Sequence, residues 1–95
     1  MNEVVIVSAC RTAIGKFLGV YKDVPAKELA VTVGKEAIKR AGVPADTIDE
    51  IVMGQVYQHM QKSLPARIVG LECGLSHESN ACVVNQNCTS AMRAL

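Results

Sequence analysis

The sequence predicts an α/β fold with a mainly parallel sheet, because short apolar segments alternate with segments of helical spacing. The strand-like segments are 3–9, 48–57 and 81–84, and the helical ones are 26–41, 65–73 and 85–95. Alternation of this kind is typical of parallel strands joined by right-handed crossover helices. The first segment, E-V-V-I-V-S-A, is apolar on both faces, which indicates a strand covered by helices on each side.

The composition describes one globular domain and excludes several partners. The chain has 95 residues, 49% of them apolar, and a formal net charge of +1. Without basic runs and with three aromatic residues, the sequence does not favour nucleic acid as a partner. Its apolar stretches are far shorter than the roughly 18 residues that span a bilayer. We therefore expect a soluble, cytoplasmic protein that acts at no membrane.

The boundaries of the elements follow from local signals. Pro25 suits the first turn of the helix over 26–41, and Gly42 suits its end. Gly54, inside the second strand-like segment, is typical of a bulge or of a close approach between backbones. The last helical run reaches Leu95 without a capping residue. We therefore interpret residues 1–95 as an incomplete domain.

Four cysteines lie at positions 10, 73, 82 and 88, and their intervals match neither a metal-binding pattern nor a dense disulfide framework. We expect free thiols and no metal site. A free cysteine is most often a small buried apolar side chain, so only its surroundings can indicate chemistry.

Cys88 has such surroundings, because it lies where a buried strand turns into a helix. Ligands of open α/β folds bind at this edge of the sheet, and unpaired amides at a helix start favour the thiolate form of a cysteine. The same backbone N–H groups can stabilise an oxyanion. The two histidines, His59 and His77, fall in connections, so we expect a base from beyond Leu95.

Six motifs, in this order, resemble signatures of the thiolase family. They are V-V-I-V-S-A-C-R-T-A-I-G-K-F at 4–17, D-V-P-A-K-E-L at 23–29, A-G-V-P at 41–44, I-D-E-I-V-M-G at 48–54, P-A-R at 65–67 and N-Q-N-C-T-S-A-M-R-A at 85–94. The resemblance covers nearly the whole chain and implies the layered thiolase fold, of which residues 1–95 are the first part of the N-terminal half.

The resemblance implies a 3-ketoacyl-CoA thiolase or acetyl-CoA acetyltransferase with Cys88 as the nucleophile that carries the acyl group. The backbone N–H of Cys88 would contribute to the oxyanion hole. CoA and acyl-CoA would be substrates, with no permanently bound cofactor. The activating histidine and a second cysteine would lie beyond residue 95, so these residues alone should be inactive. The family also implies a homodimer or homotetramer.

Thr89 and Ala91 depart from the family pattern, which often has glycine there, and so does Q-H-M-Q-K-S at 58–63. We interpret Thr89 and Ala91 as substrate-binding positions that favour a 3-ketoacyl-CoA other than acetoacetyl-CoA. Two alternatives stay open at this point. One is another condensing enzyme of the 3-ketoacyl synthase type. The other is a non-catalytic thiolase-like subunit that binds acyl-CoA or a partner chain.

Overall fold

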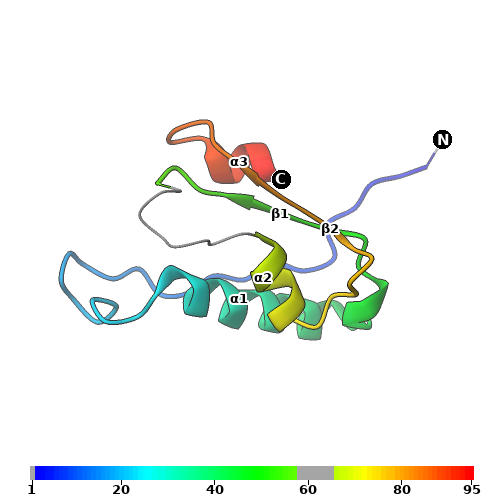
Figure 1. Cartoon of the computed structure of the whole chain (residues 1–95), viewed down its shortest axis with the longest axis horizontal. Helices are drawn as coiled ribbons and strands as arrows, with labels where there is room; N and C mark the ends of the chain where they lie inside the picture. Colours follow the sequence, from blue (N-terminus) through cyan, green and yellow to red (C-terminus); the bar gives the residue numbers. More distant parts are fainter. Residues whose placement is uncertain (1, 58–65) are drawn as a thin grey trace.

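Two parallel strands lie between helices in the computed structural model, which describes residues 2–57 and 66–95. Strands β1 (Glu50–Gly54) and β2 (Asn80–Val84) pair in register from Glu50 opposite Asn80 to Gly54 opposite Val84. Figure 1 shows three layers, with the helices of residues 26–41 and 66–72 below this sheet and the short helix of residues 90–94 above it. The predicted α/β class and parallel pairing are therefore confirmed.

The long helix α1 (Ala26–Ala41) has the bounds that its apolar stripe predicts. Pro25, with extended backbone, stands directly before it, and Gly42 ends it in the left-handed conformation at φ 71°. The Gly42 N–H donates to the carbonyls of Ile38 and Lys39, which satisfies groups that a helix end leaves unpaired. Glycine suits this position because a Cβ makes positive φ unfavourable.

The remaining helical elements connect and cover the strands. A short 3-10 turn, η1 (Ala45–Thr47), precedes β1, and helix α2 (Ala66–Glu72) joins β1 to β2. The third helix, α3 (Ser90–Ala94), follows β2 and contacts both strands. Because α1 and α2 contact each other below the sheet while α3 lies above it (Figure 1), both faces of the sheet carry helices.

A small core lies between α1, α2 and the sheet. Val69, Cys73 and Leu75 are its buried members, with Val69 only 2% exposed. Half-buried apolar side chains of α1 and β1 pack against them, among them Ile38 and Ile51. These contacts cover the lower face of the sheet. The turn that follows β2 lies beyond them, at the carboxyl end of the strands.

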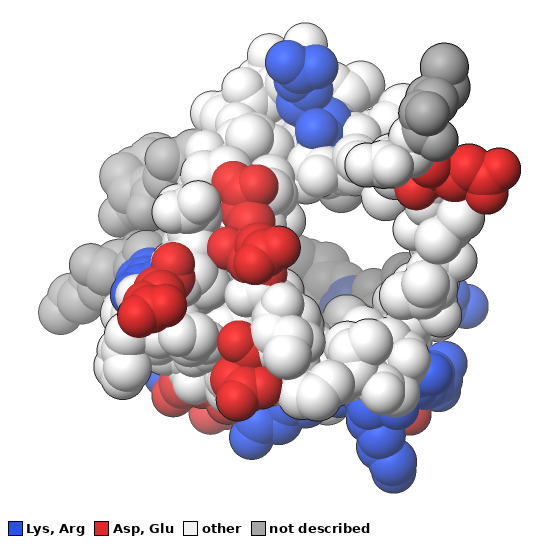
Figure 2. All heavy atoms as spheres, turned by 90° about the vertical axis from the view of Figure 1, so that its right-hand side faces the viewer, with Lys and Arg blue, Asp and Glu red and all other residues white. Residues whose placement is uncertain are grey.

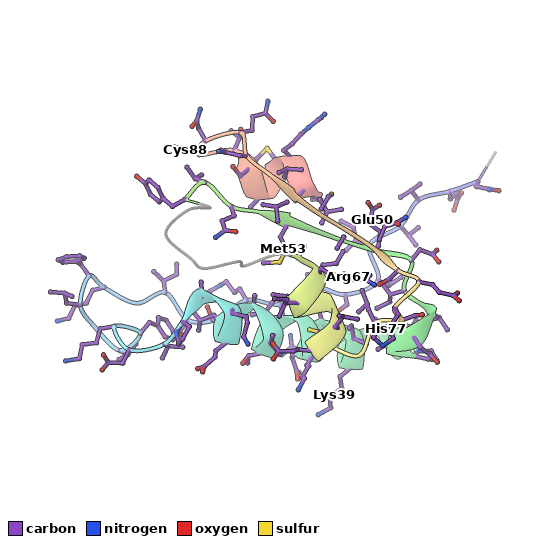
Figure 3. The ribbon with its side chains drawn as sticks, in the orientation of Figure 1. Lys39, Glu50, Met53, Arg67, His77 and Cys88 are labelled. Carbon is purple, nitrogen blue, oxygen red and sulfur yellow. The ribbon has the colours of Figure 1, made fainter. Side chains whose placement is uncertain are left out.

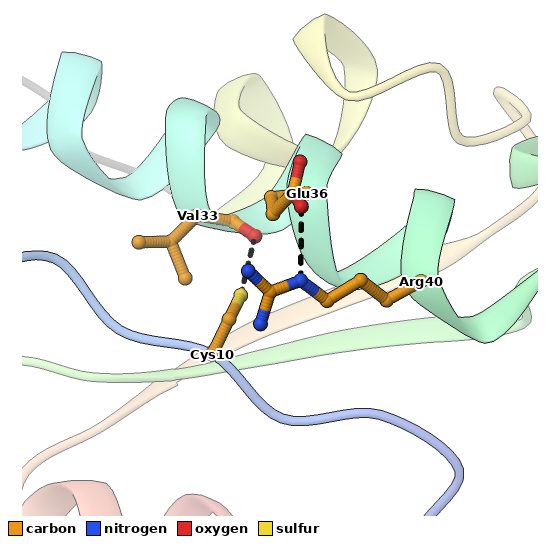
Figure 4. Close-up of polar contacts among 4 residues, drawn as sticks. All are labelled: Cys10, Val33, Glu36 and Arg40. Atoms are coloured by element: carbon orange, nitrogen blue, oxygen red, sulfur yellow. Dashed lines mark hydrogen bonds and ion pairs between the residues drawn. The ribbon is translucent and has the colours of Figure 1, made fainter.

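The strand predicted over residues 3–9 does not form. Val4 is 98% exposed and Val7 68% exposed, and no described residue pairs with the segment in a sheet. A strand needs hydrogen bonds from a neighbouring strand, and apolar composition alone does not supply them. The segment is attached to α1 at its end, where the Cys10 thiol donates to the Val33 carbonyl oxygen at 3.4 Å (Figure 4).

Surface ion pairs are few among the described residues. Figure 4 shows Arg40 Nε donating to Glu36 Oε1 at 2.9 Å, one helical turn apart on α1. A second pair joins Lys27 to Glu72 across α1 and α2 at 3.2 Å. Exposed pairs of this kind add at most about 1 kcal/mol each to the free energy of unfolding, so packing of the apolar core dominates.

Candidate active site

Cys88 lies in the turn between the end of β2 at Val84 and the start of α3 at Ser90. Its side chain is exposed, and Figure 3 shows it beyond the end of the sheet, far from the labelled residues Arg67 and His77. The predicted strand-turn-helix placement is therefore confirmed. Since the two strands are parallel, Cys88 stands at their carboxyl edge, where ligands of α/β folds bind.

Hydrogen bonds hold the turn on both sides of Cys88. The Asn85 carboxamide oxygen accepts from the Asn87 N–H at 3.1 Å. Thr89 donates twice to the Gln86 carbonyl, through its N–H at 3.1 Å and its hydroxyl at 2.8 Å. Asn87 itself has a φ of 51°, a conformation that asparagine tolerates better than most residues with a Cβ. The thiol is therefore presented by an ordered turn.

The start of α3 lies directly against the end of β1. A Cβ built on Gly54 would stand 2.6 Å from the backbone nitrogen of Ala91 and from the carbonyl carbon of Ser90. The prediction that Gly54 marks a close backbone approach is thus confirmed. A second link comes from the Asn85 side chain, which donates to the Val56 carbonyl just after β1 at 3.4 Å.

The other cysteines have different surroundings. All four are free thiols, as predicted, but only Cys73 is buried, while Cys10 is half-buried and Cys82 is exposed. Burial raises the pKa of the Cys73 thiol, and the Glu72 carboxylate raises it further against an opposing effect of Lys35. Cys73 is therefore an inert core thiol, and Cys88 is the exposed cysteine that lies in the turn.

No histidine lies near Cys88 in the described part of the chain. His77 precedes β2 whereas Cys88 follows it, and the five residues of β2 alone span roughly 16 Å. His77 is exposed in a connection, as predicted, and its carbonyl accepts from Arg67. His59 and the departure at 58–63 lie outside the described residues. Within the described residues, His77 is therefore not placed to contact Cys88.

The end of the molecule opposite Cys88 is acidic. Figure 2 views that end and shows Asp and Glu side chains gathered near its centre. A cavity of about 170 Å³ there is lined by Asp46, Asp49 and Glu78, together with Ser76 and Ser79. Its charge disfavours anionic ligands. Within residues 2–57 and 66–95, no group of three His, Cys, Asp or Glu side chains is placed to hold a metal ion.

Thr89 and Ala91, one and three residues after Cys88, are both exposed. Sequence reasoning missed Ser90 between them, which is 5% exposed and hydrogen bonded to the turn. The sequence offered one signal for Ser90, which was a hydroxyl residue close to the predicted start of a helix. The motif did not predict that this side chain would be buried.

Comparison with known proteins decides the family. The family model described as thiolase, N-terminal domain, matches residues 4–95. The chain belongs to the thiolase family. An acetyl-CoA acetyltransferase from Clostridioides difficile is 46% identical over 94 residues, which are 99% of this chain and 88% of that relative. An acetyl-CoA acetyltransferase from Paracoccus denitrificans is 42% identical over the whole chain and 24% of its own length.

Solved thiolase structures have the same fold. An acetyl-CoA acetyltransferase from Syntrophomonas wolfei matches with a TM-score of 0.88 and 44% identity over 95% of this chain and 23% of its own. A thiolase from Ascaris suum in complex with coenzyme A matches with a TM-score of 0.86 and 31% identity over 93% of this chain and 23% of its own. The chain thus spans about a quarter of most of these thiolases.

No helix in the described ranges of this thiolase chain is both long enough and apolar enough to cross a bilayer.

Proposed function

We propose that the protein is an acyl-CoA C-acyltransferase of the thiolase type, in which the Cys88 thiolate carries the acyl group as a thioester. The observation that carries the proposal is the position of Cys88, an exposed thiol in a hydrogen-bonded turn at the carboxyl edge of a parallel sheet. Membership of the thiolase family and relatives named acetyl-CoA acetyltransferase support it. They do not favour the condensing-enzyme and non-catalytic alternatives.

The chemistry proceeds in two steps, described here in the cleavage direction. The Cys88 sulfur bonds to the 3-keto carbon of a 3-ketoacyl-CoA, and the bond between carbons 2 and 3 breaks. Its electron pair goes to carbon 2 of the departing acyl-CoA enolate, which an acid then protonates. In the second step the thiolate of free CoA attacks the acyl carbon, and the Cys88 sulfur leaves. Condensation of two acyl-CoA molecules is the reverse sequence.

CoA and acyl-CoA are therefore the proposed substrates, with no permanently bound cofactor. The backbone N–H of Cys88 would stabilise the oxyanion of the tetrahedral intermediate. Residues outside 1–95 would supply the activating histidine and the acid that protonates the enolate. A homodimer or homotetramer and a cytoplasmic location complete the proposal.

Thr89 and Ala91 are proposed to shape the acyl end of the site. Both side chains are exposed, and they flank Ser90 in the sequence within three residues of Cys88. Glycine is frequent in the family at both positions; compared with glycine, Ala91 adds a methyl group and Thr89 adds a hydroxyethyl group, which also brings a polar hydroxyl. Volume changes of that size alter discrimination between substrates by about 1–3 kcal/mol.

Two cysteine variants of the full natural chain test the proposal. Cys88→Ser should lower the rate of CoA-dependent 3-ketoacyl-CoA cleavage below detection, because a serine hydroxyl at neutral pH is a far weaker nucleophile than a thiolate. Cys82→Ser changes another exposed free thiol and serves as the matched control. It should keep normal activity. Full activity in Cys88→Ser, or equal losses in both variants, would refute the assignment.

A further inference from the structure

The Ser90 hydroxyl bridges the two backbone groups that come before Cys88. Its Oγ accepts a hydrogen bond from the Gln86 N–H at 2.9 Å and donates one to the Asn87 carbonyl oxygen at 2.7 Å. One side chain therefore uses both hydrogen-bonding capacities of its hydroxyl within the same turn. The bridge closes a ring of backbone that runs from Gln86 to Ser90, and Cys88 lies inside that ring.

Burial distinguishes this bridge from the other hydrogen bonds of the turn. Ser90 is 5% exposed, whereas Thr89 and Asn85 are exposed, so water can replace the bonds that those two side chains make. The two hydrogen bonds that Ser90 makes are partly buried, so they are better shielded from water than the exposed ones. Removing its hydroxyl would leave the Gln86 N–H without this partner and the Asn87 carbonyl with the Ser90 N–H at 3.1 Å alone, and proteins avoid leaving backbone groups unpaired where they are shielded from water.

The bridged segment also contains an unfavourable backbone conformation. Asn87, directly before Cys88, has a φ of 51°, which costs energy for any residue with a Cβ. Such conformations persist where the surroundings fix them. The Ser90 hydroxyl fixes the carbonyl of Asn87 itself, and the Asn85 side chain fixes its N–H at 3.1 Å.

We propose that Ser90 is a positioning residue for the reaction, whose buried hydroxyl holds the 86–90 turn so that the Cys88 thiol and N–H meet the substrate in a reactive geometry. The proposal rests on the function proposed above. Ser90 touches no reacting atom in this scheme and acts through Cys88. A nucleophile misplaced by about 1 Å can lose on the order of 100-fold in rate.

The protein contains a matched control in Ser79, at the opposite end of β2. Ser79 is also buried, at 9% exposure, and its hydroxyl donates to the Ser76 carbonyl oxygen at 2.6 Å. Ser79→Ala therefore removes a buried, hydrogen-bonded hydroxyl from the connection that precedes β2, without touching the turn of Cys88. A general loss of stability would follow from either substitution, whereas loss of positioning would follow only from that at Ser90.

The experiment compares Ser90→Ala and Ser79→Ala in the full natural chain on a Cys82→Ser background, which removes the other exposed thiol of residues 1–95. It measures kcat and KM for CoA and, separately, the rate constant of Cys88 alkylation by iodoacetamide. Alkylation is followed on the peptide that contains Cys88, so cysteines beyond residue 95 do not contribute to the measured rate. Ser90→Ala should lower kcat about 10- to 100-fold with KM for CoA within two-fold, and should change the alkylation rate. Ser79→Ala should leave all three unchanged. Equal kcat in Ser90→Ala and the background protein, or an equal fall in Ser79→Ala, would overturn the proposal.

A second pair of variants keeps the test decisive if Ser90→Ala folds poorly. Ser90→Thr retains the hydroxyl, and Ser90→Val has the same shape without it. Threonine should give at least ten-fold higher kcat than valine, and equal values would overturn the proposal.

Alkylation needs no substrate, so it separates failure of the proposed function from failure of the proposal about Ser90. If the background protein has no acyltransferase activity but Ser90→Ala still alters alkylation, the proposed function fails and the bridge still controls Cys88.

Discussion

Substituting Gly54 by alanine tests how β1 supports the start of α3 and the turn that carries Cys88. The added methyl group would stand 2.6 Å from Ala91 N and Ser90 C and 2.7 Å from Ser90 O. Ordinary contacts between such atoms lie near 3.5–4.0 Å, so α3 must move away from β1 by roughly 1 Å. All three atoms belong to backbone, and no side-chain rotation can make room.

The expected size of the effect follows from that displacement. Overpacking of this kind costs about 1–3 kcal/mol in the free energy of unfolding. A shift of the Cys88 turn by about 1 Å lowers the rate of acyl transfer on the order of 100-fold. Urea unfolding measures the first quantity, and the rate of acyl-enzyme formation in a single turnover measures the second.

Gly70→Ala is the control for Gly54→Ala. A Cβ at Gly70 meets only side-chain atoms, the nearest being Ile51 Cγ2 at 3.2 Å, and alanine is favoured over glycine inside a helix by about 1 kcal/mol. The Gly70 variant should keep the parent's stability to within about 1 kcal/mol and a normal rate. If Gly54→Ala kept the parent's stability and rate as well, the account of how α3 is held would be wrong.

Two further predictions concern the buried thiol and the substrate. Burial raises the pKa of Cys73, so its neutral thiol adds stability that is fully present below the thiol's unfolded-state pKa and is lost as pH rises through the folded-state pKa. Cys73→Ala should flatten this alkaline limb in unfolding titrations, and an unchanged limb would contradict the assignment. The Thr89→Gly, Ala91→Gly double variant should shift the kcat/KM ratio between bulky 3-ketoacyl-CoA and acetoacetyl-CoA toward acetoacetyl-CoA by about 10- to 200-fold. An unchanged ratio would mean that these side chains do not set specificity.

Elements with a local cause could be predicted from the sequence. Helix α1 has an apolar stripe and ends at Gly42, whose positive φ is the conformation that a glycine stop signal predicts. The place of Cys88 followed from the order of an apolar strand and a helix, although β2 has no buried residue. The close approach at Gly54 followed from the cost of a glycine inside a strand. Each of these signals depends on a few neighbouring residues.

Features that depend on distant partners could not be predicted. Residues 3–9 have the composition of a buried strand, but pairing requires a neighbour that no local pattern specifies, and Val4 is exposed instead. Serine is common at protein surfaces, so the residue type of Ser90 did not indicate that it would be buried. The role proposed for Ser90 follows from its burial and from the left-handed conformation of Asn87, both of which are properties of the folded chain.

The most direct test of the central claim is a peptide map of the acyl-enzyme. The full natural chain is incubated briefly with acyl-CoA, quenched in acid to preserve thioesters, digested, and analysed by mass spectrometry. The account predicts one acyl group on the peptide that contains Cys88, discharged by added CoA. An acyl group on Cys10, Cys73 or Cys82 with Cys88 unmodified would contradict it.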